Sequence, residues 1–114
     1  MSNKRTHLDY LVDILESLSD LDGFVAGMNF LDFSADKKTI NAVIRSLEVV
    51  GEAVKKLPVS LREEHPDIPW VEIAGMRDKL IHEYFGVDLE IVWETIQGDL
   101  VSLKKVVSAL LDHK

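Results

Sequence analysis

Apolar side chains recur at intervals of three and four residues along nearly the whole chain, which is the spacing of helices with one buried face. This pattern predicts a first helix over about residues 5–26, interrupted by Gly27 and the segment 28–33. The main apolar positions of this helix are Leu8, Leu11, Leu15, Leu18 and Leu21.

A second helix is predicted to begin after Ser34 or Asp36, since either side chain suits an N-cap. It runs to about Leu57 and stops before Pro58. Its expected core stripe is Ile40, Val43, Leu47, Val50, Val54 and Leu57.

The remaining chain predicts one short turn of helix and two further long helices. The turn covers about residues 60–64 and ends before two prolines. A third helix begins near Trp70 and ends near Phe85, where Gly86 supplies a C-cap. The fourth starts after the N-cap Asp88 and continues to about residue 111. Its apolar positions are Leu89, Val92, Ile96, Leu100, Leu103, Val107 and Leu110.

These elements predict an all-α protein, an antiparallel bundle of four long helices plus a short helical turn. The 114 residues amount to one domain, 1–114. No apolar run approaches the length of a membrane span, and the N-terminus is not that of a signal peptide, so we expect a soluble, cytoplasmic protein.

Charge and composition narrow the possible functions. The chain has 13 Lys plus Arg against 20 Asp plus Glu, a net charge of −7. This balance argues against a constitutive, tight binder of duplex DNA, although an enzyme that handles RNA through a few local cations stays possible. Cysteine is absent, which excludes disulfides, thiolate nucleophiles and cysteine-based zinc sites.

Arg77 interrupts the apolar arc of the third helix. On a helical wheel it lies at the centre of an arc that includes Trp70, Ile73 and Ile81. A lone guanidinium there is costly unless it is paired or faces a cavity. The sequence leaves both explanations open: an ion pair with a carboxylate on another helix, or a functional cation.

Asp78 and His82 are four residues apart, so they share one face at the edge of that arc. They are either an ordinary surface pair or an acid–base pair in which Asp78 orients His82. Tyr84 lies close to Arg77 on the wheel. It is either a core residue or part of the same site as Arg77. Two metal ligands are too few for a catalytic zinc, so we expect no metal.

The second helix carries a polar stripe opposite its apolar face. Its members are Asn41, Arg45, Glu48 and Glu52. One explanation is a solvated ladder of ion pairs. The other is that Glu48 or Glu52 meets Arg77, or that Arg45 adds positive charge to a shared cleft.

Residues 77–84 have the form Arg-x4-His-x-Tyr, which resembles the HepT branch of the HEPN superfamily. Three further segments, 42–53, 66–70 and 86–93, are similar to that branch in the same order. The resemblance covers nearly the whole chain.

The resemblance implies a metal-independent endoribonuclease without a cofactor, acting as the toxin of a type VII-like toxin–antitoxin pair. Its partner would be a minimal nucleotidyltransferase that silences the toxin by attaching AMP to a tyrosine. Arg77 and His82 correspond to the catalytic residues and Tyr84 to the modified one. The branch commonly has Asn where this chain has Asp78, a carboxylate that either repels the RNA phosphate or orients His82.

The chemistry of these residues fits such an enzyme. RNA is cleaved without metal when its own 2′-hydroxyl attacks the phosphate, which requires proton transfer near neutral pH and a cation for the developing charge. One chain supplies only one histidine at this place, so a base and an acid together require a homodimer. The alternative is a non-enzymatic helical partner of a nucleotidyltransferase, in which Arg77 and Asp78 only form ion pairs.

Overall fold

The computed structural model describes residues 5–82 and 88–113, and for residues 77 and 79–82 it describes the backbone alone. These residues form helices without any strand among them, which confirms the predicted all-α class. The helices are α1 (His7–Val25), α2 (Phe30–Ala35), α3 (Lys37–Lys55), α4 (Val59–Glu63), α5 (Trp70–His82), α6 (Leu89–Gln97) and α7 (Asp99–Asp112).

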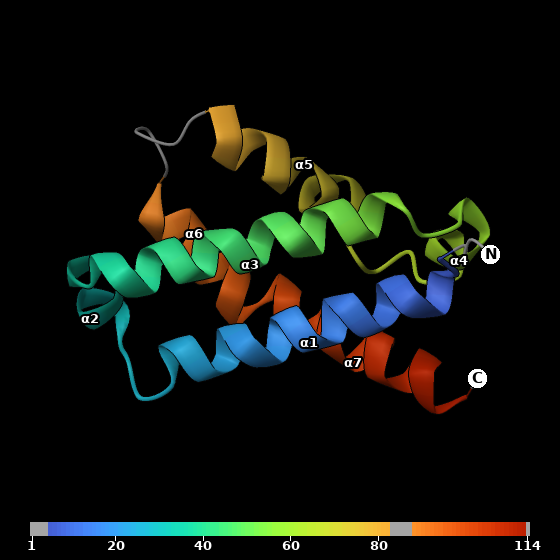
Figure 1. Cartoon of the computed structure of the whole chain (residues 1–114), viewed down its shortest axis with the longest axis horizontal. Coiled ribbons are helices and arrows are strands. Elements are labelled where there is room, and N and C mark those ends of the chain that lie inside the picture. Colours follow the sequence, from blue (N-terminus) through green and yellow to red (C-terminus); the bar gives the residue numbers. More distant parts are fainter. Residues whose placement is uncertain (1–4, 83–87, 114) are drawn as a thin grey trace.

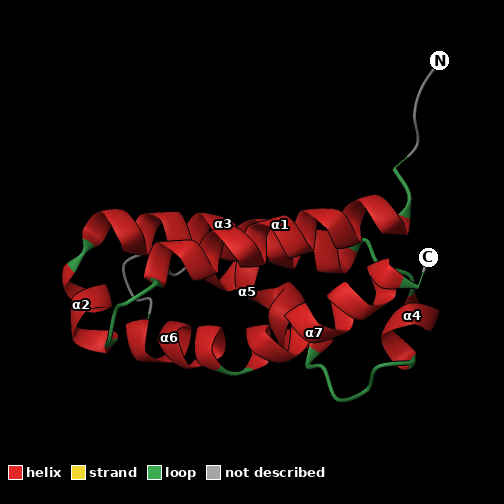
Figure 2. Cartoon of the chain, turned by 90° about the horizontal axis from the view of Figure 1, so that it is seen from below, coloured by secondary structure: helices red, strands yellow, loops and turns green. Residues whose placement is uncertain are grey.

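The long helices alternate in direction, and α3 lies between α1 and α5 (Figure 1). Seen from below, α6 and α7 form a second layer beneath α1 and α3 (Figure 2). In this arrangement α7 packs against α1 and α6, whereas α5 packs chiefly against α3. The helix that carries the Arg-x4-His motif therefore lies at one side of the bundle. None of the described helices combines the length and apolar character needed to cross a membrane.

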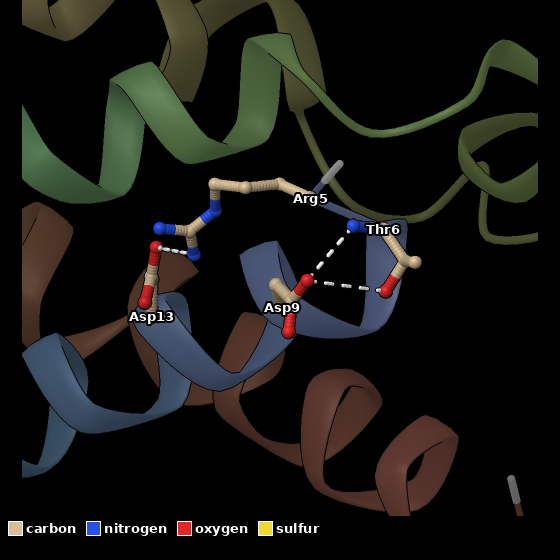
Figure 3. Close-up of polar contacts among 4 residues, drawn as sticks. All are labelled: Arg5, Thr6, Asp9 and Asp13. Carbon is tan, nitrogen blue, oxygen red and sulfur yellow. Dashed lines mark hydrogen bonds and ion pairs between the residues drawn. The ribbon is translucent and has the colours of Figure 1, made fainter. Parts of the chain in front are cut away.

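The first helix begins with a capping box that the sequence contains as Thr6-x-x-Asp9. The Thr6 backbone N–H donates to Asp9 Oδ2 at 2.8 Å, which satisfies a group that the helix itself leaves unpaired (Figure 3). Nearby, Arg5 forms an ion pair with Asp13 and places its guanidinium over the Tyr10 ring at 4.8 Å. These contacts fix the chain where it enters α1.

Asp36, and not Ser34, is the N-cap of α3. Asp36 Oδ1 accepts from the Thr39 backbone N–H at 3.2 Å and Oδ2 accepts from the Thr39 hydroxyl at 2.8 Å. These hydrogen bonds, the backbone one first, hold the pKa of the Asp36 carboxyl below its usual value because they stabilise the charged form. The helix ends at Lys55, close to the predicted end.

Because α3 lies between two neighbours, it buries residues over a wide arc. The predicted stripe is buried except for the half-buried Ile40. Small residues are buried beside it, which lets neighbouring helices approach. The buried residues of α3 are Val43, Ile44, Ser46, Leu47, Val50, Gly51, Ala53 and Val54.

Gly27 and the segment 28–33 separate α1 from α3, as predicted, but the expectation did not include the short helix α2, which begins at Phe30. Asn29 caps this short helix by accepting from the Asp32 backbone N–H at 2.8 Å. Phe33 is completely buried, with its ring centroid 5.2 Å from that of Trp93 on α6. The helix has too few residues for its periodicity to be recognised, and its burial depends on a contact 60 residues away.

The predicted fourth helix is two helices, α6 and α7, separated at Gly98. Gly98 has φ −120° and ψ −83°, which is not helical, and its N–H donates to the Glu94 carbonyl at 3.0 Å. The expectation of one continuous helix was wrong because the apolar repeat passes through the break without a change of spacing.

The chain between α3 and α5 follows the prediction more closely. The short turn expected at 60–64 is α4, one residue earlier at its start. Helix α5 begins at Trp70, whose indole N–H donates to the His65 carbonyl at 2.9 Å. The predicted end near Phe85 and the C-cap Gly86 lie outside the described residues.

Candidate active site

Two faces of α5 can be distinguished from its described side chains. Trp70 and Ile73 are buried, as the apolar arc predicts. Val71, Gly75 and Asp78 are exposed, and Val71 is 76% exposed. The motif helix therefore has one face in the core and one face open to the surroundings.

The backbone register of α5 relates the motif positions to these two faces. Position 77 follows Ile73 by four residues, which places it on the face that packs inward. Position 82 follows Asp78 by four residues and Gly75 by seven, which places it on the open face. The side chains of Arg77 and His82 are outside the described part, and Tyr84 lies outside the described residues altogether.

Asp78 is the candidate site residue whose side chain the structure describes on α5. Its Oδ2 lies 3.0 Å from Lys55 Nζ, so an ion pair connects α5 to the last turn of α3. The orientation of His82 by Asp78 stays a prediction, since the contact would involve a side chain outside the description. The structure shows in addition that a cation from a different helix, Lys55 of α3, lies beside Asp78.

Sequence reasoning missed Lys55. It follows Glu52 by three residues at the polar end of a helix, a position typical of a solvated lysine. Periodicity assigns a residue to a face of its own helix, but it does not determine which residue of α3 lies opposite which residue of α5.

The polar stripe of α3 forms at least part of the expected ion-pair ladder. Arg45 Nη1 lies 3.8 Å from Glu48 Oε2, one turn apart, and the Arg45 side chain is largely exposed. Arg45, Glu48 and Glu52 line a hollow of about 350 Å³ together with Tyr10 and Asp13 of α1. The described residues of this hollow come from α1 and α3 and the adjoining Lys56, so Arg45 lies toward α1. A contact of Glu48 or Glu52 with Arg77 stays a prediction, because that side chain is not described.

Among the side chains that the structure describes, no three His, Asp or Glu residues come together to hold a metal ion. A positive charge does lie beside the described part of the candidate site, as the Lys55 ammonium 3.0 Å from Asp78.

Comparison with known proteins gives the class of this chain. The sequence model of the family described as "Ribonuclease HepT-like" matches residues 14–110. A protein of Thermococcus cleftensis named "Probable ribonuclease HepT" is 52% identical over 101 residues, which cover 89% of this chain and 92% of the relative. A protein of Caldanaerobacter subterraneus named "Putative RNase TTE0752" is 50% identical over 110 residues, 96% of this chain and 98% of the relative. A comparison with solved structures finds no significant match.

A small helical protein with these relatives is a ribonuclease by class. The chain belongs to the HepT-like ribonuclease family. This membership confirms both the resemblance seen in the motif and the expected kind of enzyme.

Proposed function

We propose that the protein is a metal-independent endoribonuclease and the toxin of a type VII-like toxin–antitoxin pair. The observation that carries this proposal is family membership over most of the chain together with the Arg-x4-His motif on α5. The open face of α5, which continues in register to position 82, supports it because a macromolecular substrate must reach the proton-transfer group.

In the proposed reaction the RNA 2′-hydroxyl attacks the adjacent phosphorus, and the bond to the 5′-oxygen of the next nucleotide breaks. His82 moves a proton in this step, since imidazole titrates near neutral pH. Arg77 stabilises the charge that develops on the phosphate oxygens, for which the planar guanidinium is well suited. The products are a 2′,3′-cyclic phosphate and a free 5′-hydroxyl.

The proposal includes a homodimer. Attack requires a base and departure requires an acid, and each chain supplies one His82. Val71 and Gly75 lie on the same open face as Asp78. The exposed apolar side chain of Val71 and the lack of a side chain at Gly75 suit close packing of another helix on this face. A second copy that packs on this face would bring two motif helices together. A monomer mass that stays constant at micromolar and higher protein concentration would contradict this arrangement.

The direct test is incubation of the purified protein with total RNA in the presence of EDTA. Cleavage is expected to persist and to leave 2′,3′-cyclic phosphate ends, because the proposed chemistry uses no metal. His82→Ala is the matched control, prepared in the same way and checked for helical content by circular dichroism. Equal cleavage by the wild type and His82→Ala would show that a contaminant or another residue is responsible.

Silencing by a cognate minimal nucleotidyltransferase is the second part of the proposal. The Tyr84 oxygen would attack the α-phosphorus of ATP, forming a tyrosyl-AMP ester and releasing pyrophosphate. The added phosphate is an anion that could pair with Arg77 and occupy the cation that RNA requires.

Tyr84→Phe tests this part because it removes the acceptor oxygen and keeps the ring. The variant should cleave RNA but gain no mass when it is incubated with the nucleotidyltransferase and ATP. Intact-mass spectrometry measures the result, with the wild type as control. An AMP-sized gain on Tyr84→Phe equal to that of the wild type would exclude this tyrosine as the modified residue.

A further inference from the structure

The ion pair between Lys55 and Asp78 connects a variable position inside the motif to a residue outside it. Asp78 directly follows Arg77 and precedes His82 by one helical turn. Lys55 belongs to a different helix, 23 residues earlier in the chain. The pair therefore fixes a charge next to the motif from outside the motif helix.

Exposure indicates that this pair does little for folding. The Lys55 and Asp78 side chains are 36% and 52% exposed, and ion pairs with this much contact to water contribute little to stability. The molecule contains a close counterpart on another side. Lys104 of α7 and Asp22 of α1 are 2.8 Å apart and are 37% and 56% exposed. The structural value of the two pairs should be nearly the same.

The location of the first pair gives it a different consequence. A carboxylate on the open face of α5, the face that also includes position 82, repels the phosphate backbone of an approaching RNA. This matters in a chain whose net charge is already −7. The Lys55 ammonium, 3.0 Å from Asp78 Oδ2, offsets the negative charge of that carboxylate and restrains its position.

We infer that Lys55 is a positioning residue of the ribonuclease site: it offsets the charge of Asp78 and holds that carboxylate in place, so that the open face of α5 stays accessible to the RNA phosphate. This inference rests on the proposed function. It assigns Lys55 an action through Asp78, and not a direct contact with RNA.

The test compares steady-state cleavage of a defined RNA by the wild type, Lys55→Gln, Asp78→Asn and the double variant. Lys55→Gln should raise KM about three- to fivefold, the effect of losing one partly exposed countercharge, with kcat changed less. Asp78→Asn removes the charge that Lys55 offsets, so adding it to Lys55→Gln should return KM to near the wild-type value. Binding of an uncleavable 2′-deoxy analogue of the same oligonucleotide should follow the same order.

Two variants serve as controls for charge alone. Lys56→Gln removes one positive charge at the neighbouring position, which lines the hollow toward α1. Lys104→Gln breaks the counterpart pair on α7. Both should leave KM close to that of the wild type.

Each result decides the question. If Asp78→Asn fails to restore KM in the double variant, Lys55 acts on RNA directly and the inference is wrong. If Lys55→Gln behaves like Lys104→Gln, or loses its helical circular dichroism signal, the pair is only structural and the inference is also wrong. Absence of EDTA-resistant cleavage by the wild type would instead remove the proposed function itself.

Discussion

The two lysine–aspartate pairs of this protein are nearly identical in length and exposure, yet they connect different parts of the bundle. One connects α3 to α5 beside the proposed catalytic residues. The other connects α7 to α1, and each of these helices packs against a further long helix. The local chemistry of an ion pair thus says little about its importance. What distinguishes the two pairs is that Asp78 belongs to the helix of the Arg-x4-His motif, whereas Asp22 belongs to α1.

The largest effect should come from Arg77, which belongs to the α5 side. Arg77→Ala removes the cation that stabilises the phosphate in the proposed reaction, and cleavage should fall by about 10²- to 10³-fold. Arg77→Lys should recover only part of this loss, because an ammonium cannot bind phosphate oxygens in bidentate fashion. Initial rates on a labelled RNA measure both variants.

The control for Arg77 is Lys105→Ala on α7, an exposed cation whose loss should leave the rate unchanged. A comparable loss in Lys105→Ala would mean that general charge, and not the position next to Asp78, determines activity.

Truncation of a buried residue should have different effects on activity in α5 and in α7. Leu103 of α7 is completely buried and Ile73 of α5 is 3% exposed, so truncation of either to alanine should lower the unfolding free energy by about 2–5 kcal/mol. Leu103→Ala should keep the activity per folded molecule, whereas Ile73→Ala should also reduce activity because it disturbs the helix of the motif. Urea unfolding measures the loss of stability, and cleavage rates per folded molecule measure activity. If Leu103→Ala and Ile73→Ala retained activity equally, the expected difference between α7 and α5 would be wrong.

The two ion pairs themselves should have a small and similar effect on stability. Lys55→Gln and Lys104→Gln should each lower the unfolding free energy by at most about 1 kcal/mol, since partly exposed pairs are screened by water and salt. Thermal unfolding in parallel samples checks the expectation. A much larger loss for Lys55→Gln would indicate that its pair braces α5 and would remove the distinction drawn above.

The smallest effect concerns acid stability at the opposite end of α3. The pKa of Asp36 is lowered in the folded protein, first by the hydrogen bond from the Thr39 backbone N–H. The charged carboxylate therefore stabilises the fold above the unfolded pKa of about 4, and this contribution is lost as the pH falls through the folded pKa. Asp36→Asn keeps an N-cap but does not titrate, so its unfolding free energy should fall less steeply below pH 4 than that of the wild type. Identical slopes would contradict this assignment.

The sequence was sufficient for α1 and α3 because their apolar spacing persists over several turns, but the same persistence concealed the break between α6 and α7 at Gly98. The start of α5 was predicted correctly at Trp70, after a proline, and the N-cap of α3 is Asp36, one of the two candidates that the sequence offered. Helix α2 was missed because six residues contain too little periodicity, and Phe33 is held by Trp93 from a distant part of the chain.

Less of the candidate site than of the fold could be predicted from the sequence. The motif identified the family, and the wheel of the third helix correctly placed Trp70 and Ile73 in the core. The partner of Asp78 was not predictable, because Lys55 meets it only through the relative position of two packed helices. Short-range spacing contains no information about that alignment.

Gly98 has a consequence for how the chain tolerates changes in length. The apolar positions before and after it, Val92, Ile96, Leu100 and Leu103, are all buried, so α6 and α7 change direction while their hydrophobic stripes stay in phase. Each inserted residue would rotate everything after it by about 100°, turning the stripe of α7 away from α1. The bend therefore accommodates a change of angle but not a change of residue number, and the spacing from Asp88 to the end of α7 should be among the least adjustable lengths in the protein.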